Sequence, residues 1–193
     1  MIEIYFGSRV VYLTDEEEPY YAHFVDRNQL KNLVSKFQDG NYEKLYISNS
    51  DLNLLFQNFK SLFMYEEAAG GLVINSSKQI LAIKNHDTWQ LPKGHVQENE
   101  SYAEAALREV VEECSISEPT IIDQLPSTFH TFRIRDKWHL KRTYWFKMMY
   151  KRNEKPIPQA EEGITEAKWF DKKDLYLILE NTYKNLMPIW EHA

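Results

Sequence analysis

Three closely spaced glutamates, Glu109, Glu112 and Glu113, are the first candidates for a functional site in this sequence. On a helix that advances about 100° per residue they fall within an arc of roughly 100°, so their carboxylates would lie within mutual reach. Three like charges so close together repel one another unless a cation lies among them. A hard divalent cation such as Mg²⁺ is the natural candidate, because it prefers carboxylate, carbonyl and water oxygens as ligands. A solvated acidic helix face is the alternative.

The three glutamates are expected to lie on a helix that starts near Tyr102. Ser101 followed three residues later by Glu104 is the signature of a capping box, which stabilises the first turn of a helix. Apolar residues then recur on the side opposite the glutamates, and this side is expected to face the core. They are Ala103, Ala106, Leu107, Val110 and Cys114. Arg108, at the edge of the acidic face, could brace one carboxylate and also Glu100.

The spacing around this helix matches a known pattern. The segment resembles the Nudix box, Gly-x5-Glu-x7-Arg-Glu-U-x-Glu-Glu-x-Gly-U, in which U is a bulky aliphatic residue. The matching residues are Gly94, Glu100, Arg108, Glu109, Val110, Glu112, Glu113 and Ile116. A chance match is on the order of one in a million, since each polar position has a background frequency of roughly 6%. Ser115 stands where the pattern has its last glycine, a C-cap position in the left-handed region where Ser costs about 1 kcal/mol.

This resemblance implies the fold and the activity of the Nudix family. The fold class would be α/β (α+β), with an α/β/α sandwich around a mixed sheet. The activity would be hydrolysis of a nucleoside diphosphate linked to another group X, by attack of water at phosphorus, with Mg²⁺ or Mn²⁺ as cofactor. The layout agrees with this chemistry. Diphosphate cleavage needs its charge neutralised and a water held in line, so metals and carboxylates suffice without a covalent nucleophile.

The resemblance also implies which residues hold the metal. Glu109 and Glu113 would be the main ligands, and Glu112 and the carbonyl group of Gly94 would assist. Gly94 is expected to let the backbone turn, so that its carbonyl group could face the metal.

Other residues complete the expected catalytic group. Arg108 belongs to it and, together with Glu100, would hold the geometry of the loop and the helix. Nudix proteins often recruit one more carboxylate from a loop late in the domain, as general base or as an extra metal ligand. An acidic loop in this chain offers Glu162 as the first choice and Glu161 as the second, and Glu109 is the third candidate for the base. An ordinary solvated loop is the alternative.

Basic residues indicate a highly charged substrate. Lys93 lies in a segment, residues 91–95, that is similar to the entry of Nudix enzymes acting on dinucleoside polyphosphates and diphosphoinositol polyphosphates. Residues 133–155 hold nine basic and two acidic side chains, a local charge of +7. A positive wall beside a metal site would suit a polyphosphate, and a solvated hairpin is the alternative. The candidate substrate-binding residues in this stretch are Arg133, Arg135 and Lys141.

Two classes of function are therefore open. The first is a metal-dependent pyrophosphohydrolase whose partner is a small phosphorylated molecule of the nucleotide type. The second is a non-catalytic nucleotide sensor or interaction protein on the Nudix fold, against which the complete set of box carboxylates argues. A homodimer would be ordinary for the family, although the sequence specifies no interface.

Composition agrees with a globular enzyme. The chain has 193 residues, of which 43% are hydrophobic, and one cysteine. It is long enough to bury a core, and a lone cysteine excludes a disulfide framework or a Cys-based zinc site. No run approaches 18 apolar residues and the first residues lack a signal-peptide pattern, so we expect a cytoplasmic protein without a membrane partner. The net charge of -6 argues against nucleic acid as the main partner.

The periodicity of the sequence predicts two domains. Residues 1–63 read as a small ββαβα unit of unknown role, and residues 64–193 as the Nudix domain. No Gly/Ser linker separates them, so we expect them to pack together. In the second domain the pattern predicts separate strands at Thr120–Leu125 and Ser127–Ile134. It also predicts a closing amphipathic helix between Asp171 and Trp190.

Overall fold

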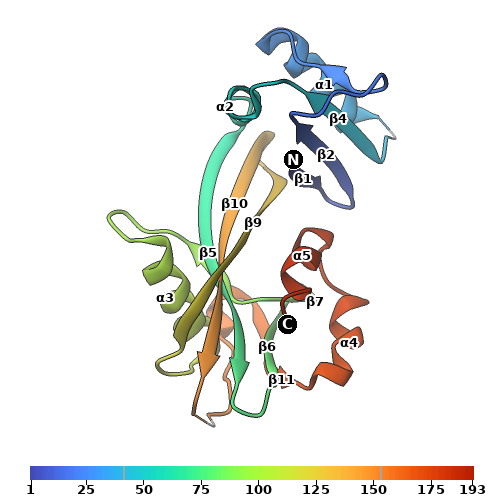
Figure 1. Ribbon diagram of the computed structural model, residues 1–193. Coiled ribbons are helices and arrows are strands. Elements are labelled where there is room, and N and C mark those ends of the chain that lie inside the picture. The colour runs from blue at the N-terminus through green and yellow to red at the C-terminus, as the bar shows by residue number, and fades with distance from the viewer. Residues whose placement is uncertain (41, 153) are drawn as a thin grey trace. The chain divides into compact units, whose positions relative to one another are not determined.

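The computed structural model describes residues 1–40, 42–152 and 154–193 and divides into two compact units (Figure 1). Unit 1 consists of Met1–Glu66 and Phe129–Arg142. Unit 2 consists of Glu67–Thr128 and Thr143–Ala193. Three long strands pass from one unit into the other, and part of a hairpin that belongs to the second half of the sequence is thereby grouped with the N-terminal residues.

Unit 1 is a sheet with two helices. Its strands have the order β9-β1-β2-β4-β3, where β9 is the strand Thr120–Ile134. Strand β1 is antiparallel to β2 and parallel to β9, and β4 is parallel to both β2 and β3. The predicted strands and helices are all present, and the two-residue strand β3 is an addition. The elements are β1 (Ile2–Phe6), β2 (Arg9–Thr14), β3 (Ala22–His23), α1 (Arg27–Asp39), β4 (Lys44–Ser48) and α2 (Leu52–Lys60).

The core of unit 1 depends on two aspartate caps and on the hairpin. The Asp26 carboxylate accepts hydrogen bonds from two amides in the first turn of α1, and Asp51 accepts one in α2. Such caps fix where a helix starts. The apolar faces of both helices then pack on β1, β2 and β4, and Phe129 and Leu140 from the hairpin complete the cluster. Residues far apart in the sequence therefore share one core.

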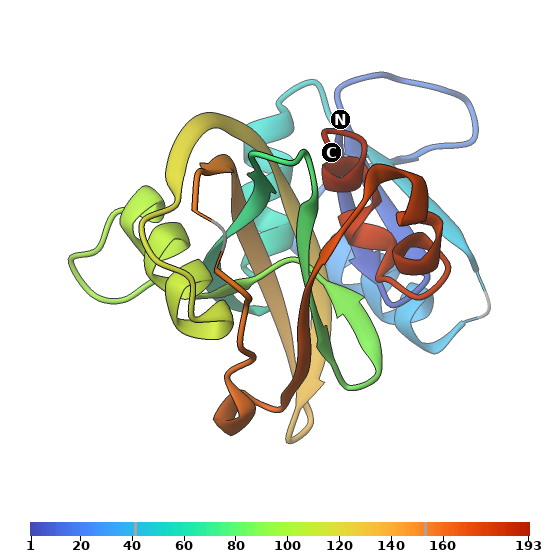
Figure 2. The same ribbon diagram turned by 90° about the horizontal axis from the view of Figure 1, so that it is seen from below.

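Unit 2 has the strand order β11-β6-β5-β10-β9, with β7 beside β6 and β8 beside β5. Figure 2 shows α3 and the C-terminal helices on opposite sides of these strands. The predicted mixed α/β sandwich is confirmed. The elements are β5 (Met64–Asn75), β6 (Ile80–Asn85), β7 (Thr88–Gln90), β8 (Lys93–His95), α3 (Tyr102–Cys114), β9 (Thr120–Ile134), β10 (Lys137–Tyr150), β11 (Ile164–Phe170), α4 (Tyr176–Leu179) and α5 (Met187–Trp190).

Each face of this sheet carries its own apolar cluster. Ala106, Val110 and Cys114 of α3 pack against Val73 and Leu81 of the strands. Ala106, Val110 and Cys114 are thus buried as predicted, whereas Ala103 and Leu107 are only partly buried. A second cluster joins residues of β5 and β6 to the C-terminal helices.

Two sequence predictions in unit 2 are wrong in detail. The strands predicted on either side of Pro126 form one strand, β9. The closing helix is broken into the short helices α4 and α5, because the chain between them pairs with β7. The amide of Trp89 donates to the Asn181 carbonyl at 2.9 Å, and Thr182 forms a parallel bridge with Trp89. None of the helices in the described part of the chain combines the length and the apolarity that a membrane crossing requires.

Ser115 is strained, and we expect Ser115→Gly to stabilise the protein. Ser115 caps the end of α3 in the left-handed conformation, with φ 51° and ψ 37°, as its position in the sequence pattern predicts. Glycine adopts this conformation without a steric penalty, so the free energy of unfolding should rise by about 1 kcal/mol and Tm by about 2–4 °C. Thermal denaturation is the measurement. Ser115→Ala, which retains a Cβ, is the control, and a gain of equal size from alanine would contradict the explanation.

Candidate active site

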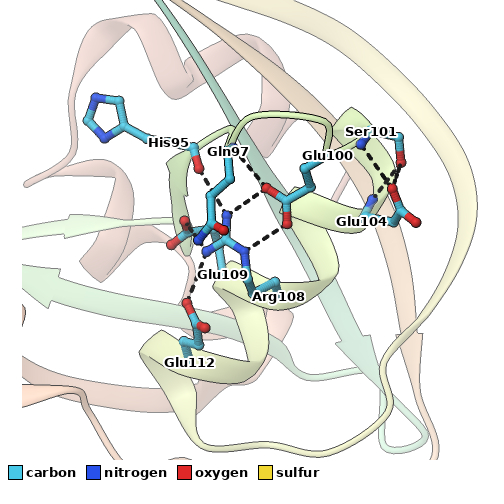
Figure 3. A network of polar contacts seen from close by, with 8 residues as sticks. All are labelled: His95, Gln97, Glu100, Ser101, Glu104, Arg108, Glu109 and Glu112. Atoms are coloured by element: carbon cyan, nitrogen blue, oxygen red, sulfur yellow. Dashed lines mark hydrogen bonds and ion pairs between the residues drawn. The ribbon is translucent and has the colours of Figure 1, made fainter.

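The loop before α3 is fixed to the start of the helix by reciprocal hydrogen bonds. The predicted capping box is present: the Glu104 amide donates to the Ser101 hydroxyl at 3.3 Å, and the Ser101 amide donates to the Glu104 carboxylate at 2.9 Å (Figure 3). The Gln97 amide donates to Glu100 at 3.0 Å. The loop therefore delivers the Glu100 carboxylate to the side of α3 that carries the glutamates.

Arg108 links this loop to the helix. Its guanidinium donates to both carboxylate oxygens of Glu100, at 2.8 and 2.9 Å, and to the His95 carbonyl at 2.9 Å (Figure 3). One of its nitrogens also donates to Glu109 at 2.6 Å and to Glu112 at 3.0 Å. Hydrogen bonds from Arg108 lower the pKa of Glu100. The fork geometry of arginine suits this task, because a bidentate pair sets both the distance and the orientation of a carboxylate.

Glu109 and Glu113 are buried carboxylates. They are 6% and 4% exposed, and Glu113 accepts a hydrogen bond from the Lys93 amide at 2.8 Å. Burial raises the pKa of Glu113 to about 8; the charges of Glu109 and Glu162 raise it too, against the lowering effect of Lys93. Burial also raises the pKa of Glu109, an effect that Arg108 opposes. Two acidic groups so placed favour a bound cation, which would offset their desolvation and mutual repulsion.

Gly94 makes room for one of these carboxylates. A Cβ at this position would overlap all three atoms of the Glu109 carboxyl group. The backbone here is part of β8 and pairs with Ala69 of β5, and its φ is not in the left-handed region. The expectation that Gly94 serves to turn the backbone is therefore wrong. The glycine is required because the Glu109 side chain lies directly against the main chain.

The acidic loop lies at the other end of the site. Glu161 and Glu162 are exposed on a single 3-10 turn, Ala160–Glu162. Just before this turn, the Gln159 amide donates to the Glu113 carbonyl at 3.1 Å. Asn85 donates to the Glu162 carbonyl at 3.2 Å. Of the two glutamates, Glu162 is the one whose charge raises the pKa of both Glu109 and Glu113.

The donor set fits a hard divalent cation. Carboxylate oxygens of Glu109 and Glu113, with the main chain of Gly94 beside them, are the ligand types that Mg²⁺ and Mn²⁺ prefer. Across residues 1–40, 42–152 and 154–193, no three acidic, imidazole or thiol groups converge closely enough to enclose an ion. Arg108 lies between Glu109 and Glu112 and holds the latter at the edge of the site. Two buried carboxylates therefore form the centre of the candidate site.

The basic candidates are divided between the two units. Lys93 is in unit 2 and acts electrostatically on Glu113. The other three are in unit 1, and two of them have partners there. Arg133 pairs with Asp136 at 2.9 Å, Arg135 lies in the turn of the hairpin, and Lys141 lies 3.4 Å from Glu66 and over the Phe132 ring. Of the four basic candidates, Lys93 is the one that lies in the same unit as the box carboxylates.

Some contacts in the site have no signal in the sequence. Three hydrogen bonds to site residues could not be predicted from the spacing of side chains. They involve the Lys93 amide, the His95 carbonyl and the Asn85 side chain. The members of these pairs are separated by 20, 13 and 77 residues along the chain. Asn85 reaches Glu162 because β6 pairs with β11.

The raised pKa of Glu113 makes stability depend on pH. In the metal-free protein its pKa is about 8, against 4.5 when unperturbed. Between these values the folded state holds a proton that the unfolded state has lost, so this contribution is complete below pH 4.5 and is lost as the pH rises through about 8. The slope is up to about 1.4 kcal/mol per pH unit.

Glu113→Gln does not titrate, so the difference in free energy of unfolding between this variant and the wild type should grow in favour of the variant as the pH rises from about 5 to 8. Urea denaturation in EDTA at several pH values measures this difference. A difference that is independent of pH would contradict the assignment.

A comparison with known protein families identifies the family of this chain. The model described as NUDIX domain matches residues 64–188, which include the whole box and the acidic loop. The chain belongs to the Nudix family. It is thus a member of a family of pyrophosphohydrolases that typically depend on divalent metals, as the sequence pattern predicts.

Individual relatives agree with this placement. The RNA pyrophosphohydrolase of Pelagibacter ubique (strain HTCC1062) is 27% identical over 143 residues, which cover 67% of this chain and 85% of that protein. A Bacillus subtilis (strain 168) protein named "Putative 8-oxo-dGTP diphosphatase" is 48% identical over 52 residues, 26% of this chain and only 35% of that protein. The MutT protein from Methanosarcina mazei Go1 shares the fold, with a TM-score of 0.50 and 20% identity over 67% of this chain and 93% of that chain.

Proposed function

We propose that this chain hydrolyses the diphosphate bond of a nucleoside diphosphate linked to a group X, or of a related polyphosphate, in a reaction that requires Mg²⁺ or Mn²⁺. The observation that carries the proposal is the pair of buried carboxylates, Glu109 and Glu113, with the exposed Glu162 beside them. The relatives named as an RNA pyrophosphohydrolase and an 8-oxo-dGTP diphosphatase support a substrate of the nucleotide type.

Each side chain then has a distinct task. Glu109 and Glu113 would hold the cation, which when bound would supply positive charge against the diphosphate. Arg108 fixes Glu109 and ties it to the loop through Glu100. Glu162 takes the proton from the attacking water, since an exposed carboxylate next to buried ones can reach the substrate side of the site. Water then attacks phosphorus in line with the leaving group, and no covalent intermediate is needed.

Lys93 is the residue we assign to phosphate binding. Its amide donates to the Glu113 carboxylate at 2.8 Å, so the backbone of Lys93 is fixed beside this carboxylate. An ammonium group there would pair with a phosphate oxygen of the substrate. Arg133, Arg135 and Lys141 lie in unit 1, and the proposal does not depend on them.

Glu162→Gln should reduce kcat at least about tenfold and leave folding intact, because an amide cannot accept the proton of the attacking water. Steady-state kinetics, with circular dichroism as the folding check, measures the effect. Glu161→Gln is the matched control, since it changes the neighbouring residue of the same turn in the same way. Unchanged turnover in Glu162→Gln, or an equal loss in Glu161→Gln, would remove Glu162 from the mechanism.

A substrate panel tests the proposed function itself. The protein with Mg²⁺ is incubated with ADP-ribose, diadenosine tetraphosphate, nucleoside triphosphates, 8-oxo-dGTP, diphosphoinositol phosphates and an RNA with a 5′ polyphosphate. We expect at least one of them to be cleaved at a diphosphate bond. If none is cleaved and a nucleotide still binds, the chain is a sensor on the Nudix fold.

A further inference from the structure

The loop that carries Glu162 is fastened to the end of α3. The Ile157 amide donates to the Cys114 carbonyl at 2.9 Å, and the Gln159 amide donates to the Glu113 carbonyl at 3.1 Å. These carbonyl groups belong to the last turn of the helix and have no partner within it, so the loop satisfies them. The loop that carries Glu162 is therefore bonded to the main chain of Glu113, whose side chain lies at the centre of the site.

Glu154 anchors the start of this loop. Its carboxylate accepts hydrogen bonds from the Ser117 amide at 2.8 Å, from the Ser117 hydroxyl at 2.8 Å and from the Tyr150 hydroxyl. These bonds lower the pKa of Glu154 to about 2, and the one from Tyr150 has the largest effect. Its carbonyl also accepts from the Trp169 indole at 3.2 Å, and the Trp169 ring stacks on Tyr150 with centroids 5.5 Å apart. One residue therefore joins β10, β11 and the segment after α3.

The segment after α3 is bent to present these donors. Ser115 and Glu118 both have positive φ, 51° and 57°, on either side of Ser117. Non-glycine residues rarely adopt this conformation without compensating contacts. The two donors that Ser117 offers to Glu154 are such contacts.

We propose that Glu154 is a positioning residue: by binding Ser117 and Tyr150 it holds the loop on the end of α3 and so places Glu162 beside Glu109 and Glu113. The inference rests on the proposed role of Glu162. Glu162 is exposed, and within residues 1–40, 42–152 and 154–193 its carboxylate accepts no hydrogen bond. Its position is therefore set by the backbone of the loop. Without Glu154, the hydrogen bonds of the Ile157 and Gln159 amides to α3 and of Asn85 to the Glu162 carbonyl would remain. The start of the loop would lose its bonds to Ser117 and Tyr150.

Three single variants separate anchoring from a general loss of structure. Glu154→Ala removes every side-chain hydrogen bond and should lower kcat at least about fivefold with KM within about twofold. Glu154→Gln retains an acceptor for Tyr150 and the Ser117 amide, and should remain within about twofold of wild-type kcat. Glu118→Gln breaks only the exposed pair with Arg152 at 2.5 Å and should leave kcat unchanged.

A double-mutant cycle with Glu162→Gln decides the mechanism. If Glu154 acts through Glu162, Glu154→Ala should lower kcat by less than about 1.5-fold in the Glu162→Gln background, because the group it positions is already inactive. A loss of about fivefold in both backgrounds would overturn the proposal, as would wild-type kcat in Glu154→Ala. If Glu162→Gln alone has wild-type activity, the base assignment fails instead. Thermal denaturation of each variant confirms that the compared proteins are folded.

Discussion

Glu113→Gln is expected to lower kcat by about 10³-fold and, at the same time, to raise the Tm of the metal-free protein. The two effects have one cause. Glu113 is 4% exposed and lies among other acidic groups, and burial raises its pKa to about 8. A neutral amide of the same shape removes the cost of burying and charging this group, and it can still accept the hydrogen bond from the Lys93 amide. It cannot hold a divalent cation in the same way.

Kinetics with Mg²⁺ and thermal denaturation in EDTA measure the two effects of Glu113→Gln. Addition of Mg²⁺ should raise the Tm of the wild type and have little effect on the variant, since a ligand stabilises only the state that binds it. Glu112→Gln is the matched control, because the side chain of Glu112 is 47% exposed and pairs with Arg108 at the edge of the site. A Glu113→Gln variant that keeps more than about a tenth of wild-type kcat would contradict the assigned role.

Gly94→Ala is the second substitution for which we expect a large effect. The added methyl group would occupy the position of the Glu109 carboxyl group, so either β8 or the carboxylate must move. The free energy of unfolding should fall by about 1–3 kcal/mol, and kcat should fall at least about 100-fold, because a displaced carboxylate no longer meets the cation.

Two comparisons make the Gly94→Ala result specific. Gly71→Ala overpacks the core, with its Cβ 2.8 Å from Met148 Sδ, and should lower stability without weakening the protein's response to Mg²⁺. Glu109→Asp combined with Gly94→Ala shortens the displaced side chain and should restore part of the stability but not the activity. Wild-type turnover in Gly94→Ala would show that Glu109 does not need its observed position.

Local signals in the sequence were sufficient to predict α3. Ser101 and Glu104 form the predicted capping box, Cys114 is buried on the predicted face, and Ser115 has the predicted left-handed conformation. Each of these features depends on residues within one or two helical turns. The contacts of Arg108 with Glu100 and Glu112 could be predicted for the same reason, because all three residues are close together in the sequence.

Features that depend on distant pairing could not be predicted in this way. The amphipathic pattern between Asp171 and Trp190 favours one helix, but the pairing of Asn181 and Thr182 with Trp89 interrupts it. The role of Gly94 could not be read from its conformational freedom, because the requirement comes from the Glu109 side chain. Likewise, Phe129 and Leu140 complete the core of unit 1 through pairing of β9 with β1.

In the proposed function, Glu109 and Glu113 support metal-dependent hydrolysis of a diphosphate bond. This role is tested by the rate of product formation from the best substrate of the panel, measured for wild type and Glu113→Gln across a titration of Mg²⁺ and again in EDTA. We predict saturable dependence on Mg²⁺ for the wild type, no turnover in EDTA, and turnover about 10³-fold lower in the variant at saturating Mg²⁺. Hydrolysis that persists in EDTA, or that is equal in the two proteins, would contradict the account.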